Sequence, residues 1–325
     1  MRAILTRKLG GPENLTLADI PSPEPGPQQV RVAVHAAGLN FADVLQIKGS
    51  YQVKPPLPFT PGIELAGVVD AVGPGATGVK LGDRVMGSLS WGAYAEQAII
   101  ADKDAFPMAP GMDFVTGAAF PVAYGTAYGG LKLRGRLAEG EVLLVHGAAG
   151  GVGLTAVEVG KRMGATVIAC AGSDEKLELA KTYGADFTIN YSREDIREKV
   201  KAFTNDRGAD VVFDPVGGDA FDASLRCIAF EGRLVIIGFA SGRIPQIPAN
   251  ILLVKNVDAV GFVWGRYREE KPGVVRQGIA ELTAMYAKGG LKPHVSHVLP
   301  LEKAAEALDL MIARKSTGKV VLKIR

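Results

Sequence analysis

The chain has 325 residues, of which 47% are hydrophobic and 22% are charged, and its formal net charge is +3. This length suits two domains, and the near balance of charge gives no indication of a nucleic-acid partner. No apolar run reaches about 18 residues, so no transmembrane helix and no membrane partner are expected. The first residues carry no signal-peptide segment, and cytoplasmic residence is therefore expected.

The first ~120 residues predict a β-rich domain, because short strand patterns alternate there with glycine and proline. The expected strands are 3–6, 30–37, 62–72, 84–87 and 93–100.

The strongest signal follows next, where an apolar strand at 142–145 runs into the turn 146–153 (HGAAGGVG). A helix over 152–163 and a strand over 166–171 complete the unit. Such a turn brings backbone N–H groups and a helix N-terminus close to a pyrophosphate. The complete context predicts a bound dinucleotide, with contacts from Gly150, Gly151, Val152 and Gly153.

From about Pro121 strands and helices alternate, with strands expected at 142–145, 166–171, 187–190, 211–214, 233–237 and 258–262. Helices between them include 174–183 and 193–203, which predicts a doubly wound parallel sheet of six strands. The basic segment 266–271 is interpreted as a solvated loop. Helices near 274–288 and 302–315 and a strand at 319–324 follow. The expected domains are a catalytic domain over 1–121, completed by 265–325, and a dinucleotide-binding domain over 122–264.

Cysteine and histidine usage argues against a metal site. The two cysteines, Cys170 and Cys227, resemble small buried hydrophobic residues in a strand and at a helix end. A disulfide framework and a thiolate zinc site are therefore excluded. Of the four histidines only His294 and His297 are close in sequence, whereas catalytic zinc needs three protein ligands. No metal is expected.

Several short motifs together resemble the medium-chain dehydrogenase/reductase superfamily, specifically its zinc-free quinone oxidoreductase (ζ-crystallin-like) branch. The resemblance covers essentially the whole chain and is carried by 40–43 (NFAD), 49–51 (GSY), 61–64 (PGIE), 82–85 (GDRV), 148–153 (AAGGVG) and 314–319 (RKSTGK). It implies an α/β fold with a GroES-like catalytic domain and a Rossmann domain. It also implies a homodimer in which the last Rossmann strands, here 258–262, pair.

The chain differs from the zinc-dependent alcohol dehydrogenases of this superfamily. Those relatives place a first zinc cysteine at the position of 38–40 and a four-cysteine structural lobe at about 85–110, and this sequence has cysteine at neither place. We therefore expect hydride transfer without a metal Lewis acid.

The second strand of the dinucleotide domain indicates which cofactor is bound. In NAD-binding units an acidic residue about 20 positions after the glycines binds the ribose 2′-hydroxyl. That position aligns best with Ala171. Asp174 lies three residues later, and binding of the ribose is the alternative to its expected role as N-cap of the helix that runs to Tyr183. A hydroxyl, a cation and helix N-terminal amides suit a 2′-phosphate instead, which favours NADPH. The resemblance assigns these contacts to Ser173, Lys176, Tyr191 and Arg314. For either cation alone, ordinary surface charge is an equally good interpretation.

The resemblance places Asn40, Thr126 and Tyr128 near the nicotinamide and its phosphates. Segments 238–241 and 262–264 would add backbone contacts, through Phe239, Ser241, Phe262 and Trp264. Tyr128 and Trp264 could equally be core aromatic residues. The segment 214–218 follows the fourth strand at the carboxyl edge, where such sheets bind ligands.

The candidate catalytic residues are Tyr51 and Asn40, eleven positions apart. Tyrosine at similar spacing protonates the substrate in medium-chain enoyl-thioester reductases, and in quinone reductases it lines the pocket. With an unperturbed pKa near 10 it donates only when positioned. Packing over the cleft mouth is the alternative. Some quinone reductases carry a second tyrosine where this chain has Leu45, which predicts a more apolar pocket.

Three functions are considered. The first is an NADPH-dependent quinone oxidoreductase that transfers hydride or electrons, and the second is an NADPH-dependent reductase of activated C=C bonds in enones or enoyl-CoA. The third is a non-enzymatic nucleotide-binding crystallin or RNA-associated protein, which the lack of a basic stripe disfavours. The motifs do not separate the first two, although Lys48 and Lys54 flank Tyr51 and could hold a CoA phosphate.

Overall fold

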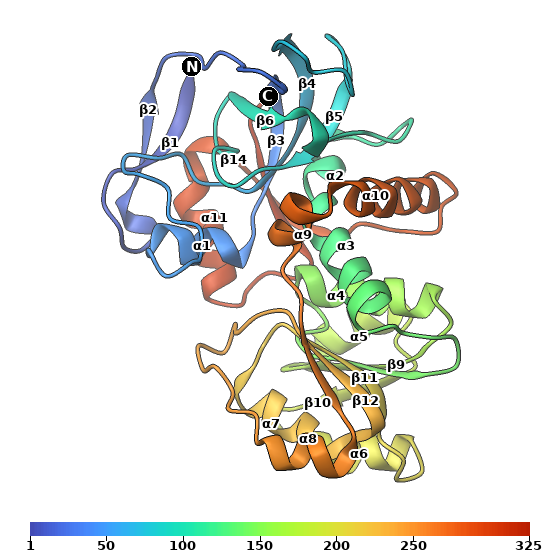
Figure 1. Cartoon of the computed structure of the whole chain (residues 1–325). Helices are drawn as coiled ribbons and strands as arrows, with labels where there is room; N and C mark the ends of the chain where they lie inside the picture. The colour runs from blue at the N-terminus through green and yellow to red at the C-terminus, as the bar shows by residue number, and fades with distance from the viewer. The chain divides into compact units, whose positions relative to one another are not determined.

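The computed structural model describes all 325 residues, which divide into two compact units (Figure 1). The first unit contains Met1–Val122 and Gly265–Arg325, and the second contains Ala123–Trp264. Both boundaries lie inside helices, namely α3 (Pro121–Tyr128) and α9 (Trp264–Glu270). The chain therefore leaves the first unit within one helix and returns to it within another.

The first unit is built on β-strands. They are β1 Arg2–Thr6, β2 Leu15–Asp19, β3 Gln29–Gly38, β4 Glu64–Val72, β5 Arg84–Ser88, β6 Gln97–Ala101, β7 Ala105–Pro107, β14 Val295–Pro300 and β15 Lys319–Lys323. Strands β1 and β2 pair by themselves, and the other seven form one sheet in the order β14-β15-β3-β4-β5-β7, with β6 also on β3. Strand β15 is antiparallel to β3, with Val321 opposite Gly38. This pairing brings the end of the chain onto the residues that follow β3.

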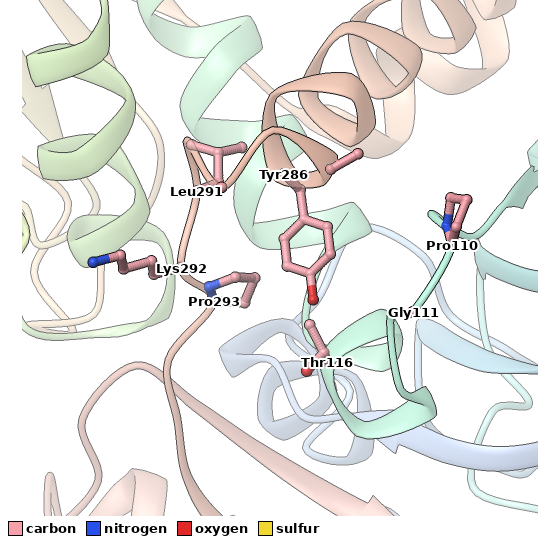
Figure 2. A pocket seen from close by; sticks show the side chains of 9 residues that line it. Pro110, Gly111, Thr116, Tyr286, Leu291, Lys292 and Pro293 are labelled. Atoms are coloured by element: carbon pink, nitrogen blue, oxygen red, sulfur yellow. The ribbon is translucent and has the colours of Figure 1, made fainter.

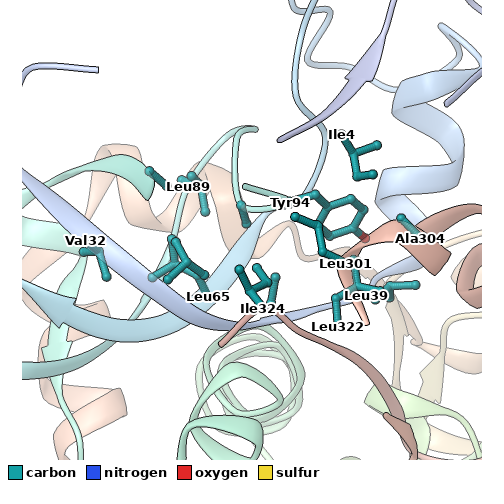
Figure 3. Close-up of a cluster of buried hydrophobic side chains, with 14 of the residues drawn as sticks. Ile4, Val32, Leu39, Leu65, Leu89, Tyr94, Leu301, Ala304, Leu322 and Ile324 are labelled. Atoms are coloured by element: carbon teal, nitrogen blue, oxygen red, sulfur yellow. The ribbon is translucent and has the colours of Figure 1, made fainter. Parts of the chain in front are cut away.

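Five helices and three 3₁₀ turns complete the first unit. They are α1 Phe41–Ile47, α2 Phe114–Ala118, α9, α10 Pro272–Ala287 and α11 Ala304–Ile312, with the 3₁₀ turns η1 Pro12–Asn14, η2 Asp102–Asp104 and η4 Leu301–Lys303. Proline at the first position of α10 suits a helix start, since its missing N–H has no partner there anyway. One apolar core holds strands and helices together, and Figure 3 shows Tyr94 among its aliphatic side chains.

The second unit contains a parallel sheet of six strands in the order β10-β9-β8-β11-β12-β13. Their bounds are β8 Val142–Val145, β9 Thr166–Ala171, β10 Phe187–Asn190, β11 Ala209–Asp214, β12 Ile228–Ile236 and β13 Asp258–Gly261. Its helices are α3, the π-helix η3 Gly129–Arg134, α4 Gly151–Arg162, α5 Asp174–Thr182, α6 Ile196–Phe203, α7 Gly218–Cys227 and α8 Ala249–Lys255. The predicted doubly wound sheet is confirmed, and the strand order reverses between β8 and β11, where such sheets bind ligands.

Most predicted elements of the second unit are confirmed within a few residues, and β8, β9 and β10 agree in full. The helix predicted over 193–203 begins later, at Ile196, because the Asp195 carboxylate accepts a hydrogen bond from the N–H of Glu198 and caps it. Strand β12 extends further toward its N-terminus than expected, from Ile228.

Three predictions in the first unit are wrong. The strand expected over 62–72 begins at Glu64, since Gly62 has a φ of 99°. The strand expected over 93–100 is confined to Gln97–Ala101, because the backbone of Tyr94 bonds instead to Pro61 and Ile4. The segment 266–271 is no solvated loop, as most of it belongs to helix α9. The strands β2, β7 and β14 were not predicted.

Candidate active site

The glycine turn after β8 is closed by its own backbone. Gly147 has a φ of 58°, and its carbonyl oxygen accepts from the N–H of Gly150 at 2.9 Å. A Cβ on Gly153 would lie 2.1 Å from that same oxygen, so only glycine fits there. Gly150 is the N-cap of α4 and offers no capping side chain. The first N–H groups of α4 are therefore free for an external anion, and the turn fits a dinucleotide pyrophosphate.

The end of β9 carries a helix cap that differs from the predicted one. Ser173, and not Asp174, is the N-cap of α5, and its hydroxyl accepts from the N–H of Lys176 at 3.4 Å. Asp174 is the first helical residue. Its carboxylate accepts from the Asn190 amide at 2.8 Å and from the Arg193 guanidinium at 2.6 Å. Ser173 is the cap because its hydroxyl oxygen lies where the first free N–H groups of α5 point.

Arg193 was not singled out from the sequence, and it changes the charge of this edge. Its guanidinium beside Asp174 holds the pKa of that carboxyl below its usual value. The acidic side chain that follows β9 is thus neutralised and already hydrogen-bonded within the protein. Each of its two oxygens therefore already accepts one hydrogen bond from the protein.

The other two residues predicted to bind the 2′-phosphate, Tyr191 and Arg314, belong to different units. Tyr191 is 44% exposed, and its hydroxyl lies 2.9 Å from the position a Cβ on Gly172 would take. Ser173, Lys176 and Tyr191 therefore share the edge formed by the ends of β9 and β10. Arg314 belongs to the first unit, where it is exposed in the turn after α11 with a φ of 56°.

Four predicted cofactor residues lie around α3 and are largely buried. The rings of Trp264 and Phe262 pack against Gly125 and Gly129, where a Cβ would lie 2.5 Å and 2.3 Å from them. Both aromatic side chains therefore close the interior of the second unit. Thr126 and Tyr128 are also buried, and the Tyr128 hydroxyl is hydrogen-bonded to the ammonium of Lys132.

The loop after β12 presents Phe239 and Ser241 at the surface. The N–H of Ser241 donates to the carbonyl of Val216 at 2.9 Å, so this loop lies on the turn after β11. Asp214 shapes that turn, because its carboxylate accepts from the N–H groups of Val216 and Gly217 at 2.7 and 2.9 Å. Asp214 is buried, and its hydrogen bonds fix the backbone of this turn.

In the first unit, Asn40 lies at the start of α1 and is only 8% exposed. Its backbone N–H donates to the Asp43 carboxylate at 2.8 Å. Its side-chain Nδ2 donates to Glu64 Oε1 and its Oδ1 accepts from the ammonium of Lys319, each at 2.8 Å. One predicted catalytic residue is thus held by three ionisable side chains that are themselves buried.

Asp43 is fully buried beneath this start of α1. One oxygen accepts from the Tyr94 hydroxyl at 2.7 Å and from the N–H of Asn40, while Oδ1 has no partner. Burial raises the pKa of the Asp43 carboxyl to about 7, against the lowering effects of these two hydrogen bonds and of Lys319. The first unit therefore contains a buried carboxyl group whose pKa is close to neutral pH.

Tyr51, in the loop after α1, is partly exposed, and its hydroxyl has no hydrogen-bond partner within the chain. Burial raises the pKa of this hydroxyl, the nearby Asp43 charge raises it further, and Arg268 lowers it. Arg268 is 6% exposed and lies 3.7 Å from the Asp104 carboxylate. Sequence reasoning missed this arginine, since its charged neighbours in the chain indicated a solvent-exposed segment. At neutral pH the Tyr51 hydroxyl keeps its proton.

A separate hollow of about 500 Å³ opens in the first unit beside the end of α10 (Figure 2). Figure 2 shows the Tyr286 side chain directed toward Thr116, with Lys292 and Pro293 along the rim. None of the residues predicted for the site lines this hollow, and it has no carboxylate or histidine. Its ionisable groups are the Tyr286 hydroxyl and the Lys292 ammonium.

No group of three or more histidine, cysteine, aspartate or glutamate side chains is arranged to hold a metal ion. His294 is bonded to the Thr317 hydroxyl and His297 to that of Ser296. Both cysteines are buried thiols. No helix has the length and apolar character that crossing a membrane requires.

Comparison with known proteins agrees with this architecture. Residues 26–110 match the family described as the alcohol dehydrogenase GroES-like domain, and residues 151–280 match that described as zinc-binding dehydrogenase. The chain is 43% identical over 325 residues to the mouse quinone oxidoreductase-like protein 2, covering 100% of this chain and 92% of that protein. It is 35% identical to human quinone oxidoreductase, covering 99% and 97%.

Among solved structures, Escherichia coli quinone oxidoreductase complexed with NADPH superposes with a TM-score of 0.94 at 31% identity, covering 99% of this chain and 100% of that one. The chain therefore shares the fold of this oxidoreductase over nearly its whole length. The chain belongs to the quinone oxidoreductase branch of the medium-chain dehydrogenase/reductase superfamily.

Proposed function

We propose that this protein is an NADPH-dependent quinone oxidoreductase that works without a catalytic metal. The observation that carries the proposal is the partly exposed hydroxyl of Tyr51, for which the structure records no hydrogen bond, in the same unit as the buried amide of Asn40. In addition, the Lys319 ammonium bonds to both Asn40 and Glu64, so the amide is held by groups of the protein itself. The NADPH complex of the Escherichia coli relative supports the choice of cofactor.

Reduction of a quinone to a quinol needs one hydride and one proton. When bound, NADPH supplies the hydride to the conjugated acceptor. The Tyr51 O–H gives its proton to the quinone oxygen that becomes negative, and the second N–H of Asn40 Nδ2 is available to hydrogen-bond an acceptor oxygen. The tyrosinate left behind is partly exposed, so water can return its proton.

An acceptor series tests this function. The purified protein should oxidise NADPH with 9,10-phenanthrenequinone and 1,4-benzoquinone, and Tyr51→Phe should lower kcat by on the order of 100-fold, because the proton donor is lost. Tyr183→Phe is the matched control, since this tyrosine lies at the end of α5, and its activity should be unchanged.

An alkyl enone and crotonyl-CoA complete the series. Turnover of crotonyl-CoA alone, abolished by Tyr51→Phe, would replace the quinone assignment by reduction of activated C=C bonds. If the protein reduces none of these acceptors, both enzymatic functions are contradicted.

We also propose NADPH as the preferred cofactor, supported by the edge at β9 and β10. Asp174 is neutralised by Arg193, and the remaining groups there are a hydroxyl, a cation and a phenol. Their donors suit the dianionic 2′-phosphate better than a neutral ribose hydroxyl.

Lys176→Ala should weaken NADPH binding roughly 10-fold and leave NADH binding almost unchanged, because one charge-assisted contact to the phosphate is lost. Dissociation constants from nucleotide fluorescence measure both effects. Lys181→Ala, on the same helix but bonded to Glu178, should change neither. Equal losses for the two nucleotides after Lys176→Ala would contradict the assignment.

We further propose a homodimer that pairs the β13 edge of two chains. Strand β13 is the last in the sheet order, so one side of it has no neighbour. Large apolar side chains close to it along the chain are strongly exposed, with Leu253 and Val254 at 78% each. Light scattering on the purified chain tests this assembly.

A further inference from the structure

Lys319 is a buried cation to which the function above gives no direct role. It begins β15, and its side chain is only 5% exposed. The ammonium donates to the carbonyl of Leu39, to Asn40 Oδ1 and to Glu64 Oε1. An ammonium has three N–H donors, and all three are used. Lys319 therefore has no donor left for a reactant.

The charges around Asn40 determine which way its amide points. An ammonium can only donate and a carboxylate can only accept, so Oδ1 must face Lys319 and Nδ2 must face Glu64. The contacts in the structure agree, at 2.8 Å each. Nδ2 carries a second N–H, and this hydrogen is the part of the side chain that no protein group uses.

The backbone keeps this arrangement in place. The N–H of Leu39 bonds to the carbonyl of Val320, which ties the start of α1 to β15. Glu64 is fully buried, and its second oxygen accepts from the N–H of Val122 at 3.1 Å. A Cβ on Gly38 would lie 2.6 Å from the Glu64 carboxylate, so glycine there leaves room for it.

We propose that Lys319 is a positioning residue that fixes the amide of Asn40, so that a donor N–H and not an oxygen is offered to the bound reactants. This inference rests on the proposed function, in which the reactants bind at Asn40. It specifies the ligand group at that point: an oxygen that accepts a hydrogen bond, such as a carbonyl. Without the charges of this ammonium and of its partner Glu64, the amide can rotate and present Oδ1, which repels such an oxygen.

A purely structural ion pair between β15 and β4 is the competing explanation, and a double-mutant cycle separates the two. Lys319→Met together with Glu64→Gln removes both charges and leaves no unpaired buried carboxylate. We expect this pair of changes to lower kcat roughly 10- to 100-fold with little effect on KM. In an Asn40→Ala background the same pair should have no further effect on kcat, because its effect acts through that amide.

Arg233→Met provides the matched control. This arginine is also a largely buried cation, paired with Glu141 at 2.6 Å, but it belongs to the second unit, whereas Asn40 belongs to the first. Its loss should lower the urea midpoint of unfolding and leave kcat unchanged. Losses of kcat that add in full on the Asn40→Ala background would overturn the positioning role.

A second measurement needs neither cofactor nor acceptor. The Asn40 side-chain amide signals are assigned in ¹⁵N NMR spectra by their absence in Asn40→Ala. They should show slow exchange with water in the native protein and fast exchange in the Lys319→Met, Glu64→Gln variant. Identical exchange in both would refute the inference. If the amide is held by Lys319 yet no quinone is reduced, the proposed function fails while the positioning role stands.

Discussion

Gly153→Ala is expected to weaken NADPH binding by at least about 100-fold. The new Cβ would lie 2.1 Å from the carbonyl oxygen of Gly147 and 2.7 Å from its carbon, and both are backbone atoms that no side-chain rotation can move. The first turn of α4 must therefore shift away from the glycine turn. Its N–H groups would then miss the pyrophosphate, and displacements of about 1 Å at such contacts cost this much.

Titration of NADPH followed by nucleotide fluorescence measures the loss. Gly273→Ala is a suitable control, because it also adds a methyl group near a helix start, in α10, where a Cβ meets nothing within 4 Å. Urea unfolding of both variants shows whether the fold persists. Unchanged affinity in a folded Gly153→Ala protein would mean that the turn after β8 does not bind the cofactor.

The dinucleotide half of the protein was predictable because its signals are local. The strand β8, the turn after it and helix α4 follow one another directly, and apolar runs, glycines and helix periodicity mark each of them. The error at α5 was also local. Ser173 and Asp174 are both good N-cap residues, and sequence alone does not determine which side-chain oxygen reaches the free N–H groups.

The polar network of the first unit was not predictable in the same way. The motifs that contain Asn40, Glu64 and Lys319 were each recognised, but Lys319 follows Asn40 by 279 positions. Their contact depends on the pairing of β15 with β3, which no periodicity in the sequence specifies. Each of the three residues is polar, so a pattern that uses hydrophobicity to infer burial places them at the surface.

The same limit applies to Arg268 on α9. Several of its neighbours in sequence are charged and exposed, whereas its own side chain is buried and lies beside Asp104 and Ser90, which are far away in the sequence. These examples concern charged groups whose burial is permitted by partners far along the chain. Such sites are therefore the ones at which a structure adds most to a reading of the sequence.

The second large expected effect is a pH dependence of the free energy of unfolding, which the buried carboxyl of Asp43 causes. Its pKa of about 7 in the folded chain lies above the ordinary value of 3.8, so the folded state binds this proton more tightly than the unfolded state does. Between about pH 4 and pH 7 the unfolded chain has lost the proton while the folded chain retains it. The free energy of unfolding therefore falls as pH rises through this window, by about 4 kcal/mol in total.

Asp43→Asn should remove this dependence. The asparagine carbonyl can still accept from Tyr94 and from the N–H of Asn40, while its amide occupies the place of the unpartnered Oδ1. Relative to the native protein, the variant should gain about 3 kcal/mol between pH 5 and pH 8, measured by urea unfolding at both pH values. Asp174→Asn is the control, because that exposed carboxyl has a lowered pKa and is ionised in both states throughout this range. Parallel pH profiles for the native protein and Asp43→Asn would show that Asp43 is already ionised at pH 5, and that the neighbouring Lys319 and Asn40 outweigh its burial.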